Sequence, residues 1–204
     1  MQTPVSPNSG AARSRRLALI VLLLLSAGAL LLLRHVSPGR IGTAAALPEV
    51  ARTNLMLVEG RLRQTGSTTP FTGLMVEHYA DGTLRSRSTI SNGLLHGLSQ
   101  GWHTNAQLQV SEHFQQGISH GLRTKWYPGG AKQSEATIVD GKLNGPFRQW
   151  HENGALSQQA EFAEDQPKGV SLAYFPSRYL KARVVMQDGQ PIEQEFWKDG
   201  EKKD

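Results

Sequence analysis

The stretch GLRTKWYPGGAKQSEATIVDGKLNGPFRQWHENG, from Gly121 to Gly154, indicates the architecture of this chain. The pair Gly129-Gly130 has a counterpart in Asn153-Gly154, and each pair comes shortly after a tryptophan. Such pairs are typical of two-residue hairpin turns, because glycine and asparagine tolerate the positive φ that the turn requires. The segments on either side have the length of ordinary strands, about five to six residues. The stretch therefore predicts consecutive β-hairpins.

The spacing of these two pairs extends in both directions along the chain as a 24-residue period. One glycine series precedes the strands: Gly73, Gly97, Gly121, Gly145 and Gly169. A second keeps the same period: Gly93, Gly117, Gly141 and Gly189, with Asp165 in the missing place. The turn pairs are Asp81-Gly82, Asn105-Ala106, Gly129-Gly130, Asn153-Gly154 and Ser177-Arg178. An aromatic series is Trp102, Trp126, Trp150 and Tyr174, beside Tyr79, His103, Tyr127, His151 and Phe175. An apolar series is Ile90, Phe114, Ile138, Phe162 and Met186.

These series predict an all-β fold, an elongated single-layer antiparallel meander of about five 24-residue hairpin repeats over residues 73–190. Short Gly-x-x-x-Gly links, such as Gly117 to Gly121, reverse the chain between hairpins. Each hairpin alone would be marginally stable, so stacking on its neighbours stabilises it. Residues 54–72 are expected to form an N-terminal strand or cap. Residues 191–204 are expected to form a terminal half-repeat with a charged tail that protects the open edge.

Two copies of the repeat interrupt the pattern. Ala106 replaces a turn glycine, and an alanine at positive φ costs about 1–2 kcal/mol, so the second hairpin is expected to use another turn type. In the fifth copy Pro176 and Arg178 stand at the tight turn, and Asp165 and Pro167 interrupt the linker. We therefore expect the fifth repeat to be the loosest one.

The N-terminal segment has a different composition. Residues 17–33 read LALIVLLLLSAGALLLL, without a charged residue, and as a helix they would just span a hydrocarbon core of about 30 Å. The sequence predicts a cytoplasmic tail at 1–16, a transmembrane signal anchor at 17–33 and a linker at 34–53. The positive flanks place the repeats outside the cytoplasm, at a bacterial inner membrane. Cleavage after Ala46 remains the alternative to an uncleaved anchor.

Charge and cysteine content exclude several classes of protein. The formal net charge of +5 comes entirely from the five arginines of residues 1–46, and the remaining chain is balanced. The repeats therefore offer no net field for a polyanion, and we expect no nucleic-acid binding. The absence of cysteine excludes disulfides, thiol catalysis and cysteine-based zinc sites.

The repeats resemble a known family. Phe71-Thr72-Gly73, Trp126-Tyr127-Pro128-Gly129-Gly130 and the Trp-His-x-Asn-Gly stretch at 150–154 are similar to the MORN-repeat variant. The region 55–198 resembles the YwqK-type bacterial antitoxin family, which is built from such units. The resemblance implies a single-layer β-sheet and a protein-binding role, in some members neutralisation of a partner toxin.

Catalytic and metal sites find little support in the sequence. Gly97-Leu98-Ser99-Gln100-Gly101 matches a hydrolase string, but that motif needs a strand-to-helix elbow and Ser99 is expected inside a repeat strand. His96 and His120 would lie about 9–10 Å apart on adjacent hairpins, too far to share one zinc ion. We expect them to hydrogen-bond the backbone instead. No catalytic, metal-binding or cofactor-binding residue is predicted, and the chain is not expected to be an enzyme.

The aromatic series is the remaining candidate site. Trp102, Trp126, Trp150 and Tyr174 either stabilise the sheet by cross-strand packing or contact a protein partner. The glycines at 82, 97, 121, 130, 145, 154 and 169 are expected to be structural. The predicted function is a membrane-anchored protein-binding module, in its sharper form an antitoxin or immunity protein. The alternative is an envelope scaffold that binds membrane or cell-wall glycan.

Overall fold

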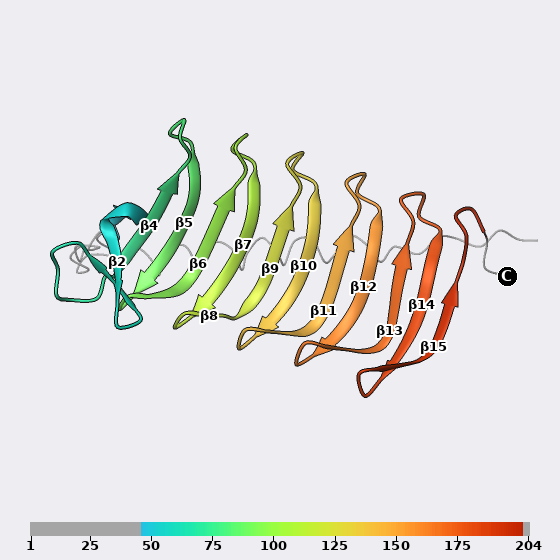
Figure 1. Cartoon of the computed structure of the whole chain (residues 1–204). Helices are drawn as coiled ribbons and strands as arrows, with labels where there is room; N and C mark the ends of the chain where they lie inside the picture. Colours follow the sequence, from blue (N-terminus) through green and yellow to red (C-terminus); the bar gives the residue numbers. More distant parts are fainter. Residues whose placement is uncertain (1–45, 202–204) are drawn as a thin grey trace, which may run out of the picture. The chain divides into compact units, whose positions relative to one another are not determined.

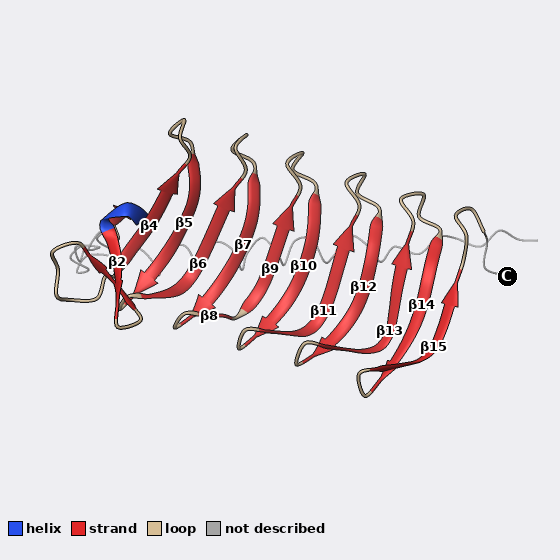
Figure 2. Cartoon of the chain, viewed as in Figure 1, coloured by secondary structure: helices blue, strands red, loops and turns tan. Residues whose placement is uncertain are grey.

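The computed structural model describes residues 46–201, which form strands with one short 3-10 helix, η1 (Arg52–Asn54). A 13-stranded sheet holds most of these residues, and a two-stranded sheet lies beside its first strands (Figures 1 and 2). The predicted all-β, mostly antiparallel meander is thus confirmed. The predicted span 17–33 lies outside the described residues. Among residues 46–201 no helix has the length and apolar content to cross a membrane.

Five hairpins lie side by side in chain order (Figure 1). Their strands are β4 (Gly73–His78) with β5 (Leu84–Ser91), β6 (Leu94–Trp102) with β7 (Leu108–Gln115), β8 (Ile118–Ser119) and β9 (Gly121–Trp126) with β10 (Lys132–Val139), β11 (Lys142–Trp150) with β12 (Leu156–Ala163), and β13 (Gln166–Tyr174) with β14 (Leu180–Gln187). The edge strand β15 (Gln190–Phe196) pairs with β14 and follows as half a repeat. The period seen in the sequence is therefore one hairpin.

The turns inside the hairpins differ from the prediction. In the third hairpin the N–H of Tyr127 donates to the carbonyl of Ala131 at 2.9 Å, and the N–H of Gly130 donates to Tyr127 at 2.8 Å. Of the pair Gly129-Gly130, only Gly130 has a positive φ, 83°. This is the three-residue turn that ends in a left-handed residue and a bulge. The predicted two-residue turn is wrong here, because only the second residue of each pair needs a left-handed backbone.

Two-residue turns connect each hairpin to the next, at the opposite end of the strands. Val139 pairs with Lys142, and the two residues between them, Asp140 and Gly141, have φ values of 49° and 83°. The corresponding positions in the other repeats behave in the same way: Asn92-Gly93, Gln116-Gly117, Glu164-Asp165 and Asp188-Gly189. Two consecutive positive φ values define the tight hairpin turn that matches strand twist. The links between repeats are therefore tighter than the expected Gly-x-x-x-Gly loops.

Glycines at the start of the second to fifth repeats sit in strands that carry a bulge, whereas Gly73 of the first repeat has no positive φ and pairs with Ile90 without a register shift. Between the pairs Ala136–Phe147 and Ile138–Leu143, β11 has two more residues than β10. The extra length surrounds Gly145, whose φ of 118° is accessible to glycine alone. The equivalent glycines also have positive φ values: Gly97 (88°), Gly121 (106°) and Gly169 (64°).

The hairpins that lack the turn glycine still form the three-residue turn of the other repeats. Ala106 and Arg178 have φ values of 63° and 73° and occupy the place of Gly130. The N–H of Arg178 donates to Phe175 at 2.8 Å, as in the other repeats. Pro176 fits because its own φ suits the second residue of this turn and no turn hydrogen bond needs its nitrogen. The expected change of turn type at Ala106 does not occur, since neighbouring hairpins impose the geometry.

Side chains of one aromatic series link each repeat to the next. The hydroxyl of Tyr79 donates to the Trp102 carbonyl at 2.7 Å, and that of Tyr127 donates to the Trp150 carbonyl at 2.9 Å. In the alternate repeats a histidine Nε2–H makes the same bond: His103 to Trp126 at 3.0 Å and His151 to Tyr174 at 2.9 Å. Each bond adds about 0.5–1.5 kcal/mol to the stacking of neighbouring hairpins.

The apolar core lies on one face of the sheet, which we call the inner face. Ile90 and Ile138 are its most buried side chains, with exposed fractions of 1% and 2%. Phe162 occupies the same position in the fourth repeat, and its ring meets that of Phe147 edge-on with a 5.8 Å centroid separation. No side chain of the fifth hairpin, β13 and β14, is buried. The core therefore thins toward the C-terminal repeat.

A cap covers the N-terminal end of the sheet. Strand β1 (Glu49–Ala51) pairs in parallel with β4, so the last residues of the predicted linker belong to the sheet. Residues 54–72, expected to form an N-terminal strand or cap, contain a hairpin of β2 (Leu55–Val58) and β3 (Arg61–Gln64). Leu55 and Phe71 pack there against Ile90 of the first repeat.

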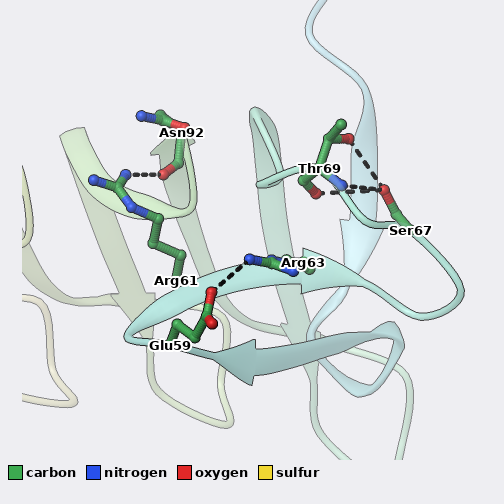
Figure 3. A network of polar contacts seen from close by, with 6 residues as sticks. All are labelled: Glu59, Arg61, Arg63, Ser67, Thr69 and Asn92. Atoms are coloured by element: carbon green, nitrogen blue, oxygen red, sulfur yellow. Dashed lines mark hydrogen bonds and ion pairs between the residues drawn. The ribbon is translucent and has the colours of Figure 1, made fainter.

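Polar contacts hold the cap in place (Figure 3). A guanidinium nitrogen of Arg61 donates to the Asn92 carbonyl at 2.5 Å, and Arg63 pairs with Glu59 at 3.0 Å. The backbone N–H of Leu62 donates to the Gly93 carbonyl at 2.8 Å. The cap is thus bonded to the first tight turn of the repeats.

Candidate binding face

The face opposite the apolar core, which we call the outer face, carries an exposed apolar row. Leu122 pairs with Thr137, which lies between the buried Ala136 and Ile138 and therefore points the other way. Leu122 is 50% exposed. Its equivalents in the other repeats are also exposed: Leu98 (38%), Pro146 and Val170 (47%). Each of these residues directly follows one of the strand glycines.

The predicted aromatic site residues lie on the same face. Trp126 is four residues beyond Leu122 on one strand, and successive side chains of a strand alternate between faces. The other members have the same offset: Trp102 from Leu98, Trp150 from Pro146, and Tyr174 from Val170. All four aromatic side chains are half-buried.

Cross-strand packing accounts for part of this burial. The backbone register sets Trp102 opposite Leu108, Trp150 opposite Leu156, and Tyr174 opposite Leu180. These pairs stabilise the sheet in the way expected of stacked side chains on a pleated surface. A partner-binding role for the aromatic row stays a prediction.

The third tryptophan has a cationic neighbour. Lys132 is opposite Trp126 in the register, and its ammonium lies 5.2 Å from the ring centroid of Trp150. Lys132 also pairs with Glu135 at 2.9 Å. An ammonium over a tryptophan ring at this distance is a favourable contact, so the aromatic edge of the face is itself partly occupied by the protein's own side chains.

A polar stripe separates the apolar row from the aromatic row. Its members are Gln100, Thr124 and Arg148, again one repeat apart, and Leu172 follows in the fifth repeat. Thr124 is buried, whereas Arg148 is exposed. The outer face therefore combines exposed apolar groups with hydrogen-bonding groups, an arrangement that often marks an interaction surface.

One shallow hollow lies on the outer face. It has a volume of about 610 Å³, lies at the C-terminal repeat and is lined by Tyr174 and Val170. A second hollow of about 350 Å³ touches Trp126, but its lining includes Val110 and Lys125, which pair on the inner face. Of the four predicted aromatic residues, Tyr174 therefore lines the hollow of the outer face.

The hydrolase-like string has no elbow geometry. Ser99 lies within β6, as predicted, and its hydroxyl is 2.7 Å from that of Ser88 on β5. Glu112, opposite Ser99 on β7, accepts hydrogen bonds from Ser119 and from Arg123. These groups form a polar patch among strands of the inner face.

The linker histidines bond the backbone, as predicted. The Nδ1 atom of His96 accepts the N–H of Gln116 at 3.4 Å, and that of His120 accepts the N–H of Asp140 at 3.5 Å. Within residues 46–201 no group of three histidine or acidic side chains is arranged to hold a metal ion. Both histidines thus support the tight turn of the following repeat.

Two charged groups at the sheet edges have shifted pKa values. The hydroxyl of Thr83 donates to Asp81, and with the Thr83 backbone N–H it lowers the pKa of that carboxyl. Glu164 lies 2.6 Å from Lys142 and raises the pKa of that ammonium. Both contacts are local to turns, and neither group lies in the apolar or aromatic row.

The apolar row is the feature that sequence reasoning missed. Its signal is present in the sequence, because an apolar residue follows every glycine of the first series. Leu74, the residue after Gly73, begins the row in the first repeat and is half-buried. Assigning the row to an exposed face required the strand register.

Comparison with known proteins gives one match. No curated protein matches the chain. MORN repeats are generally associated with membrane or protein binding. Residues 143–164, the hairpin of β11 and β12, match the family described as the MORN repeat variant, and this hairpin shares its turns and strand glycine with the other units of the sheet.

Proposed function

We propose that this chain is a membrane-anchored module whose outer face binds a partner protein outside the cytoplasm. The observation that supports the proposal is the exposed apolar row of Leu98, Leu122, Pro146 and Val170. Equivalent residues of adjacent hairpins are two strand spacings apart, about 10 Å, so the row extends over roughly 30 Å. A stable interface covers about 800 Å² on each partner, and a surface of this length accommodates it.

The sharper form of the proposal is an antitoxin or immunity protein. It draws on the resemblance to the YwqK-type family and on the exposed apolar row that recurs along the outer face. Such a face neutralises a toxin by covering a functional surface of that toxin, without any chemistry of its own. The membrane anchor, residues 17–33, would hold the repeats at the site where an incoming toxin reaches the cell envelope.

The experiment that tests the proposal is capture of partners by the full chain from detergent-solubilised membranes, followed by mass spectrometry. We expect one dominant protein partner that is retained after washing with salt. The variant Leu122→Ser removes an apolar contact from the row and should reduce capture of that partner. The matched control is Leu57→Ser in the cap, where another exposed leucine, 68% exposed, lies on β2, outside the 13-stranded sheet.

Three outcomes separate the alternatives. Loss of the partner in Leu122→Ser but not in Leu57→Ser supports binding through the outer face. Retention of the partner by both variants contradicts it. Retention of the fragment 47–204, which lacks the proposed anchor, on liposomes or peptidoglycan, with no protein partner, would support the envelope scaffold instead. A phosphatase fused to the C-terminus tests topology, since activity only in the cytoplasm would contradict the proposed orientation.

A further inference from the structure

The fifth repeat differs from the others at one turn position. Gly82, Gly130 and Gly154 provide the left-handed residue in three hairpins, whereas Arg178 provides it in the fifth, at a φ of 73°. A long side chain in this backbone region is strained relative to glycine. Ala106 adopts the same backbone conformation in the second repeat, so what distinguishes the fifth repeat is the long cationic side chain and its surroundings.

Arg178 borders the hollow of the outer face, which has a volume of about 610 Å³. Val170, Leu172 and Leu180 contribute aliphatic side chains to this hollow, and Tyr174 contributes an aromatic one. Val170 is also the last member of the exposed apolar row. The hollow therefore continues the proposed binding face at its C-terminal end, where the core is thinnest.

The two arginines of the hollow differ in their partners. Arg183 lies 2.6 Å from Glu193 and 3.9 Å from Glu195, so its charge is compensated within the sheet. Glu201, which also lines the hollow, accepts the backbone N–H of Lys198 at 2.8 Å. Within the region that the structure describes, the guanidinium of Arg178 makes no hydrogen bond or ion pair.

From these contacts we infer that the hollow receives an apolar side chain of the partner protein, flanked by a carboxylate that pairs with Arg178. Apolar and aromatic groups around an open concavity accommodate a large side chain and exclude water from it. A guanidinium without an internal acceptor is complementary to a carboxylate, which it binds through two parallel hydrogen bonds. The inference rests on the proposed protein-binding function and names the chemistry of the segment that is bound.

The test uses the full chain in detergent and a fluorescein-labelled pentapeptide, Gly-Glu-Phe-Glu-Gly, with binding read as fluorescence anisotropy. Two comparison peptides replace the glutamates by lysines or the phenylalanine by serine. We expect the parent chain to prefer the first peptide over both others. In Arg178→Gly the affinity should fall about tenfold, the value of one charge-assisted hydrogen-bond pair.

A matched control comes from the second hairpin. Ala106→Gly relieves the same backbone strain as Arg178→Gly, at the equivalent turn three repeats earlier. It should leave peptide binding unchanged. Both variants place at the turn the glycine that other repeats carry, so the unfolding midpoint of each should stay level or rise. Reduced binding with preserved stability in Arg178→Gly alone therefore assigns the loss to the guanidinium.

Equal binding of the acidic and basic peptides, or unchanged affinity in Arg178→Gly, overturns the inference. These results do not affect the proposed function, which fails separately if the full chain captures no protein partner. A partner that is lost in Leu122→Ser and kept at full affinity in Arg178→Gly would show that binding uses the row but not the hollow.

Discussion

Replacing a strand glycine with alanine should cost a different amount of stability in each repeat. Gly145 has a φ of 118°, and a Cβ atom there would lie 3.2 Å from the Cβ of Thr137 on the preceding strand. Gly169 occupies the same place one repeat later, with a φ of 64° and no atom within 4 Å of an added Cβ. The pair therefore separates backbone strain and crowding from the effect of the substitution on the unfolded chain.

The magnitudes follow from the two environments. A sparsely populated backbone conformation costs about 1–3 kcal/mol, and the close contact at Thr137 adds to it. The lower entropy of the unfolded chain offsets about 0.4–1 kcal/mol of this cost in both variants. We expect Gly145→Ala to lose about 2–3 kcal/mol and Gly169→Ala less than about 1 kcal/mol. For a domain of this size, the melting temperature should fall by roughly 5–10 °C and by at most about 3 °C, respectively.

Thermal unfolding of the full chain in detergent, followed by tryptophan fluorescence, measures both values. The parent chain and the two variants are compared in the same detergent and buffer. If Gly169→Ala destabilises the chain as much as Gly145→Ala, the φ of the glycine does not determine how much stability the substitution costs. If Gly145→Ala has the stability of the parent chain, the bulge in β11 does not have the described geometry.

Four further substitutions test the contacts of the sheet and its turns. Tyr127→Phe removes the hydrogen bond to the next repeat and should cost about 0.5–1.5 kcal/mol in thermal unfolding; no loss would mean that the bond is not formed. Ile138→Ala should cost about 2–5 kcal/mol, whereas Leu122→Ala should change stability by less than about 0.5 kcal/mol. A larger loss in Leu122→Ala than in Ile138→Ala would mean that the face assigned to the core is the exposed one. Thr83→Val removes the hydroxyl that lowers the pKa of Asp81 below its ordinary value of 3.8. The contribution of that contact is present above this value and lost as the pH falls through the lower folded-state pKa. Thr83→Val should therefore lower the melting temperature at about pH 7, and the difference from the parent chain should shrink as the pH falls below 3.8.

Much of the fold followed from spacing alone. Because glycines, turn pairs and aromatic residues recur with one common period, each strand lies between two local signals, and strand length then leaves little freedom. The number of hairpins and their order in the sheet were predictable for this reason. Ser99 and the linker histidines were placed correctly because their surroundings within one repeat are also local.

The turn types were less accessible to sequence reasoning. Asn153-Gly154 looks like a two-residue turn, yet it belongs to a three-residue turn, whereas Glu164-Asp165 has no glycine and still forms the tight one. The hydrogen bonds between neighbouring hairpins impose these conformations, and they override the intrinsic preferences of single residues.

Local patterns in the chain were enough to specify the repeat, the hairpin architecture and the composition of each row, because these depend on residues that are close together in sequence. The exposure of each row was settled by the assembled sheet. Leu122 and Ile138 are both apolar and both belong to series with the period of the repeat, but cross-strand register puts one in solvent and the other in the core. In a sheet with a single layer, burial depends on register and on the cap that folds over one end, and neither is encoded in any local pattern.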